Sequence, residues 1–286
     1  MRAVGPAVAR RQLGAELRRL RIGAGLDIAA VAAALQCSGT RVSRIETAKG
    51  RTSLRATELE QLCDLYGVTD ADKRTMLQDM RTGSQKSGWW EQFEDVLPSG
   101  LDVLVGLETD ARAVLAWEPL LVHGLLQTPA YARAVLGAGV GILPRDADAL
   151  VQLRMARQEL LTRAPAPLEL WVILDEAVLR RPVGGPAVMH EQLLHLATAA
   201  DRTAVTVQVL PLRKGAHWGL SGAFALIECD ESATIGYVDS PAGNLYVERR
   251  ADVRRLQSTL DLLRASALDP TDSVALLRDI AEEWQQ

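Results

Sequence analysis

The chain has little cysteine, little histidine and no metal-binding motif. Its 286 residues include three cysteines and four histidines. Cys37, Cys63 and Cys229 are odd in number and far apart, which excludes a disulfide framework and favours reduced thiols inside a cell. Neither CxxC nor HExxH occurs, and the histidines have no metal-ligand spacing. We therefore expect no metal and no cofactor.

The sequence also lacks a long hydrophobic run. Its N-terminal segment has no apolar core of signal-peptide length. The longest apolar stretch, PLLVHGLLQTPAYA at 119–132, is too short to span a bilayer and contains proline. These absences predict a soluble cytoplasmic protein without a membrane partner.

Length and charge divide the chain into unequal parts. Residues 1–82, called the head below, have 14 basic and 9 acidic residues, whereas the remainder has 18 and 27. The net charges are therefore +5 and −9. This asymmetry is expected if only the head binds a polyanion, and a chance surface composition is the alternative.

Residues 28–47 are predicted to form a helix-turn-helix. A helix capped by Asp27 is followed by a short turn and by a second helix, 38–47, capped by Ser38. In this motif the second helix lies in the major groove of DNA. The small core is expected to contain Val31, Leu35, Cys37, Val42 and Ile45.

The outer arc of helix 38–47 is polar. Arginine can donate to guanine or to phosphate, and hydroxyl groups reach either. The alternative is a helix-turn-helix used only for protein contact. The predicted DNA-binding residues are Ser38, Thr40, Arg41, Ser43, Arg44 and Thr47 on the helix and Lys49 and Arg51 in the loop after it.

The head contains L-R-x-x-R-x-x-x-G-L at 17–26, Ala32, and V-S-R-I-E at 42–46. Through these marks it resembles the lambda-repressor-like helix-turn-helix regulators of the xenobiotic-response-element family. The resemblance implies an all-α head of five short helices; the spacing places the other three at 10–22, 54–68 and 71–80. Gln36 replaces the usual turn glycine, which predicts a left-handed residue at a cost of roughly 1 kcal/mol.

Residues 83–100 are predicted to be a linker, and residues 101–286, called the body below, an α+β domain. Packing of Trp89 and Trp90 on the body is favoured over base stacking. Residues 101–164 are predicted to be helical, including one helix through Glu108, Ala111, Val114 and Leu115. Five strands are predicted at 168–176, 204–212, 222–230, 234–240 and 244–250.

The last three of these strands follow one another closely, so the sheet is expected to be mainly antiparallel. Helices are predicted at 191–201, 251–268 and 271–284. The body is similar to a domain of unassigned biochemistry that follows this type of head in many bacterial regulators, through segments such as WWEQFEDVLPSGL and VTVQVLPLRKGAHWGLSGAFALIE. That resemblance implies transcription control, often beside a small partner protein in an antitoxin-like arrangement.

Catalysis is not expected. GLSGA at 219–223 is similar to a nucleophile elbow, but that elbow requires a histidine after the serine, and His217 is the last histidine. His217 and Trp218, together with His123 and Gln127, form a candidate ligand or partner site. Ordinary loop side chains are the alternative.

The sequence as a whole predicts a sequence-specific transcriptional regulator that binds double-stranded DNA. We expect a homodimer whose heads bind a pseudo-palindromic operator, with half-sites about 34 Å apart. The body would provide dimerisation and signal or partner binding. The alternative is an antitoxin-like factor that mainly binds a small partner protein.

Overall fold

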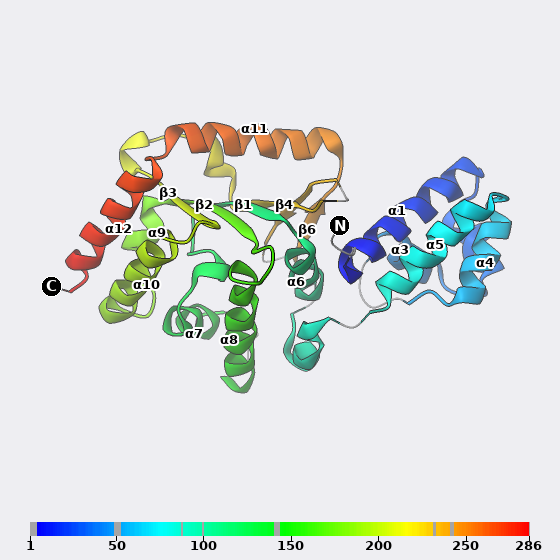
Figure 1. Ribbon diagram of the computed structural model, residues 1–286, viewed down its shortest axis with the longest axis horizontal. Coiled ribbons are helices and arrows are strands. Elements are labelled where there is room, and N and C mark those ends of the chain that lie inside the picture. Colours follow the sequence, from blue (N-terminus) through cyan, green and yellow to red (C-terminus); the bar gives the residue numbers. More distant parts are fainter. Residues whose placement is uncertain are drawn as a thin grey trace. The chain divides into compact units, whose positions relative to one another are not determined.

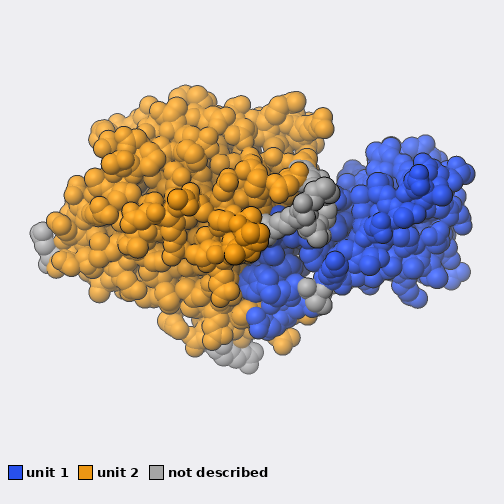
Figure 2. Space-filling view, viewed as in Figure 1, with its two compact units in different colours: residues 1–92, 98–110 blue, residues 93–97, 111–286 orange. Residues whose placement is uncertain are grey.

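The chain folds into two compact units in the computed structural model. Unit 1 contains residues 1–92 and 98–110, and unit 2 contains residues 93–97 and 111–286 (Figure 2). The structure describes residues 5–48, 53–86, 88–98, 100–139, 144–230, 233–240 and 243–285.

Unit 1 is helical throughout its described part (Figure 1). The five helices expected in the head are confirmed, and the first begins four residues earlier than expected because Pro6 occupies its first position. The helices are α1 (Pro6–Gly23), α2 (Ile28–Ala34), α3 (Gly39–Glu46), α4 (Ala56–Leu65), α5 (Ala71–Ser84) and α6 (Leu101–Asp110), with the 3-10 helix η1 (Trp89–Val96) before α6.

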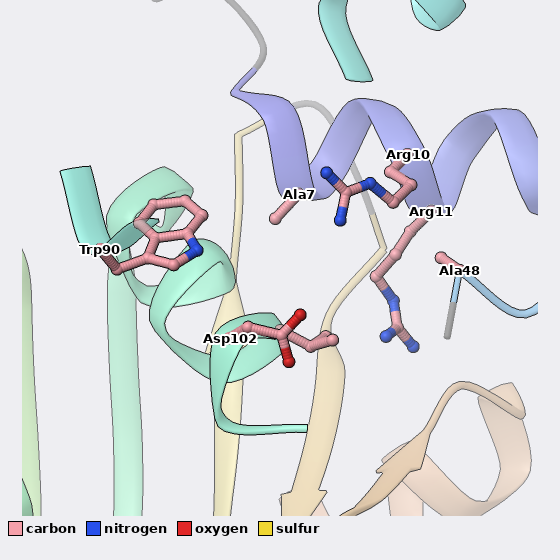
Figure 3. A pocket seen from close by; sticks show the side chains of 7 residues that line it. Ala7, Arg10, Arg11, Ala48, Trp90 and Asp102 are labelled. Atoms are coloured by element: carbon pink, nitrogen blue, oxygen red, sulfur yellow. The ribbon is translucent and has the colours of Figure 1, made fainter. Parts of the chain in front are cut away.

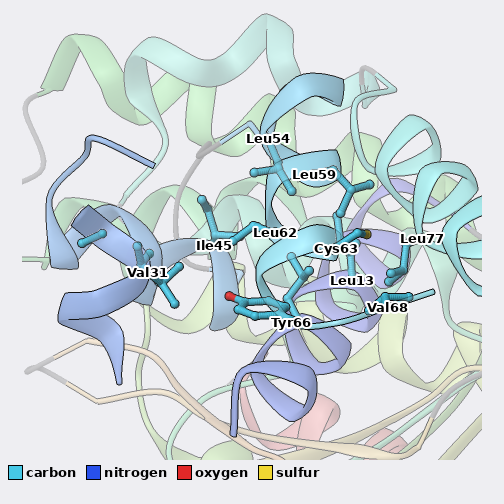
Figure 4. Close-up of a cluster of buried hydrophobic side chains, with 13 residues drawn as sticks. Leu13, Val31, Ile45, Leu54, Leu59, Leu62, Cys63, Tyr66, Val68 and Leu77 are labelled. Atoms are coloured by element: carbon cyan, nitrogen blue, oxygen red, sulfur yellow. The ribbon is translucent and has the colours of Figure 1, made fainter. Parts of the chain in front are cut away.

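The head has its own hydrophobic core, shown in Figure 4. Val31, Val42 and Ile45 are 0%, 3% and 7% exposed, which confirms the core predicted for the helix-turn-helix. Leu35 and Cys37 are partly buried against this core. The other buried members are Leu13, Leu17, Ala32, Leu54, Leu59, Leu62, Cys63, Tyr66, Val68 and Leu77.

The tryptophan pair packs within unit 1. The rings of Trp89 and Trp90 meet edge to face with centroids 6.0 Å apart. Trp89 Nε1 donates to Thr109 Oγ1 over 3.1 Å, and Trp90 is buried. A Cβ atom on Gly106 would lie 2.6 Å from Ala7 Cβ and 3.2 Å from the Trp90 ring, so α6 approaches α1 closely. The pair is packed as expected, but its partner is α6, which belongs to unit 1 although the sequence prediction placed these residues in the body.

Unit 2 is built on a six-stranded mixed sheet of order β3-β2-β1-β4-β5-β6. Strands β1, β2 and β3 are parallel to one another, whereas β4, β5 and β6 continue the sheet as an antiparallel meander. The meander is confirmed, but the prediction of a mainly antiparallel sheet was wrong. The strands are β1 (Ala113–Glu118), β2 (Glu169–Asp175), β3 (Val205–Leu210), β4 (Phe224–Glu228), β5 (Ile235–Val238) and β6 (Leu245–Val247).

The error arises at the sequence AVLAWE, which forms β1. The sequence prediction placed residues 108–115 on one helix, but α6 ends at Asp110 and β1 begins at Ala113. Strand β1 lies between β2 and β4, and most of its side chains are buried on both faces of the sheet. Such a strand shows no polar alternation, and a short apolar run does not distinguish strand from helix.

Helices cover both faces of the sheet. Helix α11 packs on one face, where Leu260 and Leu263 join Trp117, Ile173 and Leu226 in the core, and α7, α8 and α10 lie on the other face (Figure 1). The helices are α7 (Pro129–Gly137), α8 (Pro144–Gln158), α9 (Glu176–Arg180), α10 (Pro186–Ala199), α11 (Arg250–Ser266) and α12 (Pro270–Glu283), with 3-10 helices η2 (Gly124–Leu126), η3 (Glu159–Leu161), η4 (Leu212–Lys214) and η5 (Trp218–Ser221).

Helix α12 covers the outer edge of β3. Val209 N donates to Ser273 Oγ over 3.0 Å, and Leu268 N donates to Val209 O over 2.9 Å, so side-chain and backbone partners replace a neighbouring strand. Within the described ranges, no helix has the length and apolar character needed to cross a lipid bilayer.

Candidate DNA-binding surface

The turn between α2 and α3 is closed by local hydrogen bonds. Asp27 caps α2 by accepting from Ala30 N over 2.7 Å, and Ser38 Oγ accepts from Arg41 N over 3.2 Å at the start of α3. Gln36 has a φ of +50°, so the predicted left-handed residue is confirmed. Cys37 N donates to the carbonyl of Ala32 over 2.9 Å, which completes a Schellman ending for α2.

A buried ion pair holds α3 against α1. Arg21 Nε and Nη2 donate to the two carboxylate oxygens of Glu46 over 2.6 and 2.9 Å, and Arg21 Nη1 donates to Leu26 O over 2.8 Å. Hydrogen bonding to Glu46 raises the pKa of Arg21. Breaking one side of such a pair leaves a buried charge without compensation. The orientation of α3 therefore depends on this pair.

Arg21 is buried, although arginine side chains are mostly exposed in proteins. A signal was present, because Arg21 follows Leu13 and Leu17 at intervals of four on the apolar stripe. Tyr66 interacts with both charges of this pair. Burial, and to a smaller extent the charge of Glu46, raises the pKa of Tyr66 to about 12. The buried guanidinium is thus part of the core contact between helices.

Gly14 allows the backbones of α1 and α3 to meet. A Cβ atom at this position would lie 2.5 Å from Ile45 O and 2.8 Å from Glu46 O. Both are backbone atoms, which cannot move aside as the end of a flexible side chain can. The close approach holds the C-terminal end of α3, on the side opposite its polar arc.

Arg41 forms a second ion pair, with α4. Its Nη1 lies 3.0 Å from Glu58 Oε1, and its Nη2 donates to Glu58 Oε2 and Ser53 O over 3.0 and 3.1 Å. Burial alone would raise the pKa of Glu58, but hydrogen bonds from Arg41 and the Arg55 amide outweigh burial and lower it. The guanidinium is engaged within the head, and a DNA contact by Arg41 stays a prediction.

Arg44 has a different environment from Arg41. It is exposed, and no other described residue forms a hydrogen bond or ion pair with it. Thr40 and Thr47 are also exposed, at intervals of four and three from Arg44, so the three share one face of α3. Thr47 Oγ1 donates to Ser43 O over 2.7 Å. This row is the polar face that α3 presents to solvent within unit 1.

The remaining predicted contacts lie at the two ends of the row. Ser38 is exposed at the N-terminus of α3, where backbone N–H groups favour a phosphate. Ser43 is partly buried beside the row. Lys49 and Arg51 lie outside the described residues.

A small hollow in unit 1 lies beside the end of α3 (Figure 3). Arg10 Nη2 donates to Ser84 O over 3.1 Å next to it, and Ala48, with a φ of +51°, forms part of its wall. The hollow therefore lies between α1, α6 and the residue that follows the end of α3. Its lining residues are Ala7, Arg10, Arg11, Ala48, Trp90, Asp102 and Val103.

The four candidate ligand residues of the body do not form one cluster. His123 and Gln127 are buried, and His123 Nε2 lies 3.9 Å from the Glu118 carboxylate. His217 packs edge to face on Trp117, with centroids 5.2 Å apart. Successive residues of a strand point to opposite faces, so Trp117 and Glu118 place these two histidines on opposite faces of the sheet.

The loop of His217 is held by two polar contacts. His217 Nε2 lies 3.6 Å from Asp175 Oδ2, and Trp117 Nε1 donates to Gly219 O over 2.9 Å. Trp218 is 52% exposed next to them. The indole ring of Trp218 is therefore exposed on a loop whose backbone and His217 side chain are held by polar contacts.

Two family models match the chain. A helix-turn-helix domain matches residues 12–76, and a domain of unknown function, DUF5753, matches residues 101–279. The second match covers more than half of the 286 residues. The chain belongs to the DUF5753 family. The DUF5753 match begins at the first residue of α6 and includes all six strands, while the helix-turn-helix match includes α2, α3 and α4. No curated protein and no solved structure matches the chain.

Proposed function

We propose that this DUF5753 protein is a sequence-specific transcriptional regulator. Its helix-turn-helix is of the kind that binds DNA in regulators, and its α3 would enter the major groove. The proposal includes the finer assignment of the head to the lambda-repressor-like, xenobiotic-response-element type. The body would serve dimerisation and the binding of a signal or partner.

The observation that carries the proposal is the contrast between the two sides of α3. Val42, Ile45 and Glu46 are buried on the inner side. Thr40, Arg44 and Thr47 are exposed on the outer side. No other described residue forms an ion pair with Arg44. A guanidinium held outward on a rigid helix can donate both N–H groups to guanine O6 and N7.

A homodimer is the simplest way to use one recognition helix per chain. Two such helices spaced one turn of duplex apart, about 34 Å, would contact pseudo-palindromic half-sites. The net charge of +5 on the head favours attraction to phosphate, and binding should weaken steeply with salt.

Genome-wide footprinting of the bound full-length protein would identify the operator. Fluorescence anisotropy would then compare this duplex with a scrambled duplex of equal length and composition, at several salt concentrations. We expect tighter binding of the operator and two chains per duplex. Equal affinity for the two duplexes would refute sequence-specific binding, and one chain per duplex would refute the dimer.

A specific surface in unit 2 favours the alternative, an antitoxin-like factor that binds a small partner protein. Leu212, Trp218 and Leu220 are 54%, 52% and 69% exposed within nine residues of sequence. Arg213 and Lys214 are exposed between them. The chemistry fits a small acidic protein with apolar side chains at the centre of its interface.

A purified complex with an identified acidic partner would test this alternative. Trp218→Ala should abolish the complex, whereas Leu245→Ala, which removes a leucine that is 58% exposed on β6, should leave it intact. Loss of the complex in both variants, or in neither, would argue against this surface. Our proposal includes no catalytic role, and a serine-directed probe that labels Ser221 would contradict it.

A further inference from the structure

A carboxylate of α4 holds the guanidinium of Arg41, which lies on the helix proposed to enter DNA. Arg41 Nη1 lies 3.0 Å from Glu58 Oε1, and Arg41 Nη2 donates to Glu58 Oε2 over 3.0 Å. Arg41 Nη2 also donates to Ser53 O over 3.1 Å. A guanidinium contacts guanine or a phosphate group through two parallel donors of this kind. Glu58 therefore occupies the pair of donors that a bidentate DNA contact would use.

The surroundings of Glu58 keep its side chain charged and largely out of water. Its side chain is 11% exposed. Burial alone would raise the pKa of Glu58, but hydrogen bonds from Arg41 and from the Arg55 amide lower it. The Arg55 amide donates to Glu58 Oε2 over 2.8 Å, and Arg55 Nε lies 3.8 Å from Oε1 on a side chain that is 80% exposed. Loss of Arg41 would therefore leave a mostly buried carboxylate beside an exposed and more weakly placed cation.

Maintenance of the fold explains only part of this contact. The start of α4 needs a side-chain acceptor for the Arg55 amide, and a neutral glutamine at position 58 would supply one. Helix α3 is already held by the pair of Arg21 with Glu46 and by the close approach at Gly14. The negative charge at position 58 therefore acts on Arg41 beyond what the helix cap requires.

DNA would offer Arg41 the same kind of partner that Glu58 already provides. A guanidinium that moved to DNA would leave the Glu58 carboxylate without its main partner, and the phosphates of the duplex would repel that carboxylate. Salt also weakens an exposed contact to phosphate, whereas a partly buried ion pair is screened less. The carboxylate therefore has the advantage in a competition with DNA for Arg41.

Arg44 has no such competitor among the described residues, since none of them forms a hydrogen bond or an ion pair with its exposed side chain. We propose that Glu58 is a positioning residue that competes with DNA for Arg41 and leaves sequence reading by α3 mainly to Arg44. Glu58 acts through Arg41 and does not itself contact the duplex. This inference rests on the proposed function, because it assumes that α3 binds DNA, and it specifies which arginine discriminates between sequences.

Operator binding by the full-length wild type, Arg41→Ala, Glu58→Gln and the double variant would test the competition. Glutamine keeps an acceptor for the Arg55 amide, and circular dichroism would show that each protein is folded at the assay temperature. Fluorescence anisotropy would give the Kd for the operator and for a scrambled duplex at several salt concentrations. The loss of operator affinity caused by Arg41→Ala should be about 5-fold or more greater in the Glu58→Gln background than in the wild-type background, because a bidentate contact then becomes available.

The salt series identifies the part of the duplex that the released Arg41 contacts. With a phosphate contact, the plot of log Kd against log salt concentration should be steeper by about 0.9 for Glu58→Gln than for the double variant. With a base contact, these two proteins should instead differ in the ratio of their affinities for the operator and the scrambled duplex. Either difference supports the competition, because a purely structural role of Glu58 would change neither the slope nor the ratio through Arg41.

Glu60→Gln is the matched control, because it removes a carboxylate of the same helix that lies 2.9 Å from Arg74 of α5. Arg41→Ala should have the same effect in this background as in the wild type, and an enhancement equal to that in Glu58→Gln would overturn the inference. An equal effect of Arg41→Ala with and without Glu58→Gln would also overturn it, as would a larger effect in the wild type. These failures leave the operator preference of the wild type intact, whereas absence of that preference would refute the proposed function itself.

Discussion

The two arginines of α3 allow DNA contact to be separated from helix stability. Arg44 is exposed and forms no ion pair with another described residue, whereas Arg41 is bonded to Glu58 and to Ser53 O. Both residues lie on the same short helix, three positions apart. Replacing each by alanine removes the same guanidinium from two different environments.

Arg44→Ala should weaken operator binding with little effect on stability. A bidentate contact to guanine contributes about 1 to 3 kcal/mol of discrimination, which corresponds to roughly 5- to 150-fold in Kd. The side chain is exposed, so its loss should change the free energy of unfolding by no more than about 0.5 kcal/mol. The preference for the operator over a scrambled duplex should fall by the same factor as the affinity.

Arg41→Ala should act first on stability. Its side chain is 27% exposed and that of Glu58 is 11% exposed, so the pair is screened less than a surface pair and more than a fully buried one. We expect a loss of about 1 to 2 kcal/mol, between those two limits. The midpoint of the transition that contains the head should fall by at least about 4 °C.

Calorimetry and fluorescence anisotropy on the same three proteins would test this contrast. Anisotropy would be measured well below both transition midpoints, at one salt concentration, with operator and scrambled duplexes. The reasoning fails if Arg44→Ala lowers the midpoint as much as Arg41→Ala does, or if Arg44→Ala keeps both affinity and preference. The first result would mean that Arg44 stabilises the head as Arg41 does, and the second would mean that Arg44 does not contact bases.

Three further predictions concern the backbone and the charges inside the two units. Gly14→Ala should destabilise the head by about 1 to 3 kcal/mol, because its Cβ would lie 2.5 Å from Ile45 O; Gly23→Ala, with no atom within 4 Å of its Cβ, is the control. Gln36→Gly should raise the thermal midpoint, because φ is +50° and relief of roughly 1 kcal/mol of strain exceeds the free-energy cost of the added entropy of the unfolded chain; a lower midpoint would contradict this. Burial, then the charge of Asp239, raises the pKa of Glu118 from 4.5 to about 8 on folding, so its contribution to stability is present below pH 4.5 and is lost as the pH rises through 8. Glu118→Gln should therefore unfold at a higher temperature than the wild type at pH 8.5, with a smaller difference at pH 5, and equal pH profiles would disprove this.

The local structure of the head could be predicted well because it depends on neighbours in sequence. Asp27 and Ser38 cap α2 and α3 as expected, and Val42 and Ile45 are buried as their spacing indicates. A cap needs only the side chain and an amide two or three residues later. The left-handed Gln36 followed from the motif for the same reason.

The partners of charged residues could not be predicted in this way. Arg41 was expected on the outer arc, and rotation about the helix axis alone does place it there, but its side chain is long enough to reach Glu58, 17 positions away. Arg21 forms its ion pair with Glu46, which lies 25 positions later in the sequence. His123 and His217 were expected near one another, yet the alternation of β1 assigns them to different faces.

The sequence by itself determined the elements whose signals are local: five helices in the head, five of the six strands, and the polar face of α3. Tertiary structure decided the direction and neighbours of the strands, since β1 is apolar on both sides and only its pairing with β2 and β4 shows that it is a strand. It also decided which arginine of α3 remains outward, because that depends on a carboxylate supplied by α4. Periodicity records which side of an element is buried, whereas the contact between distant residues is created only when the chain folds.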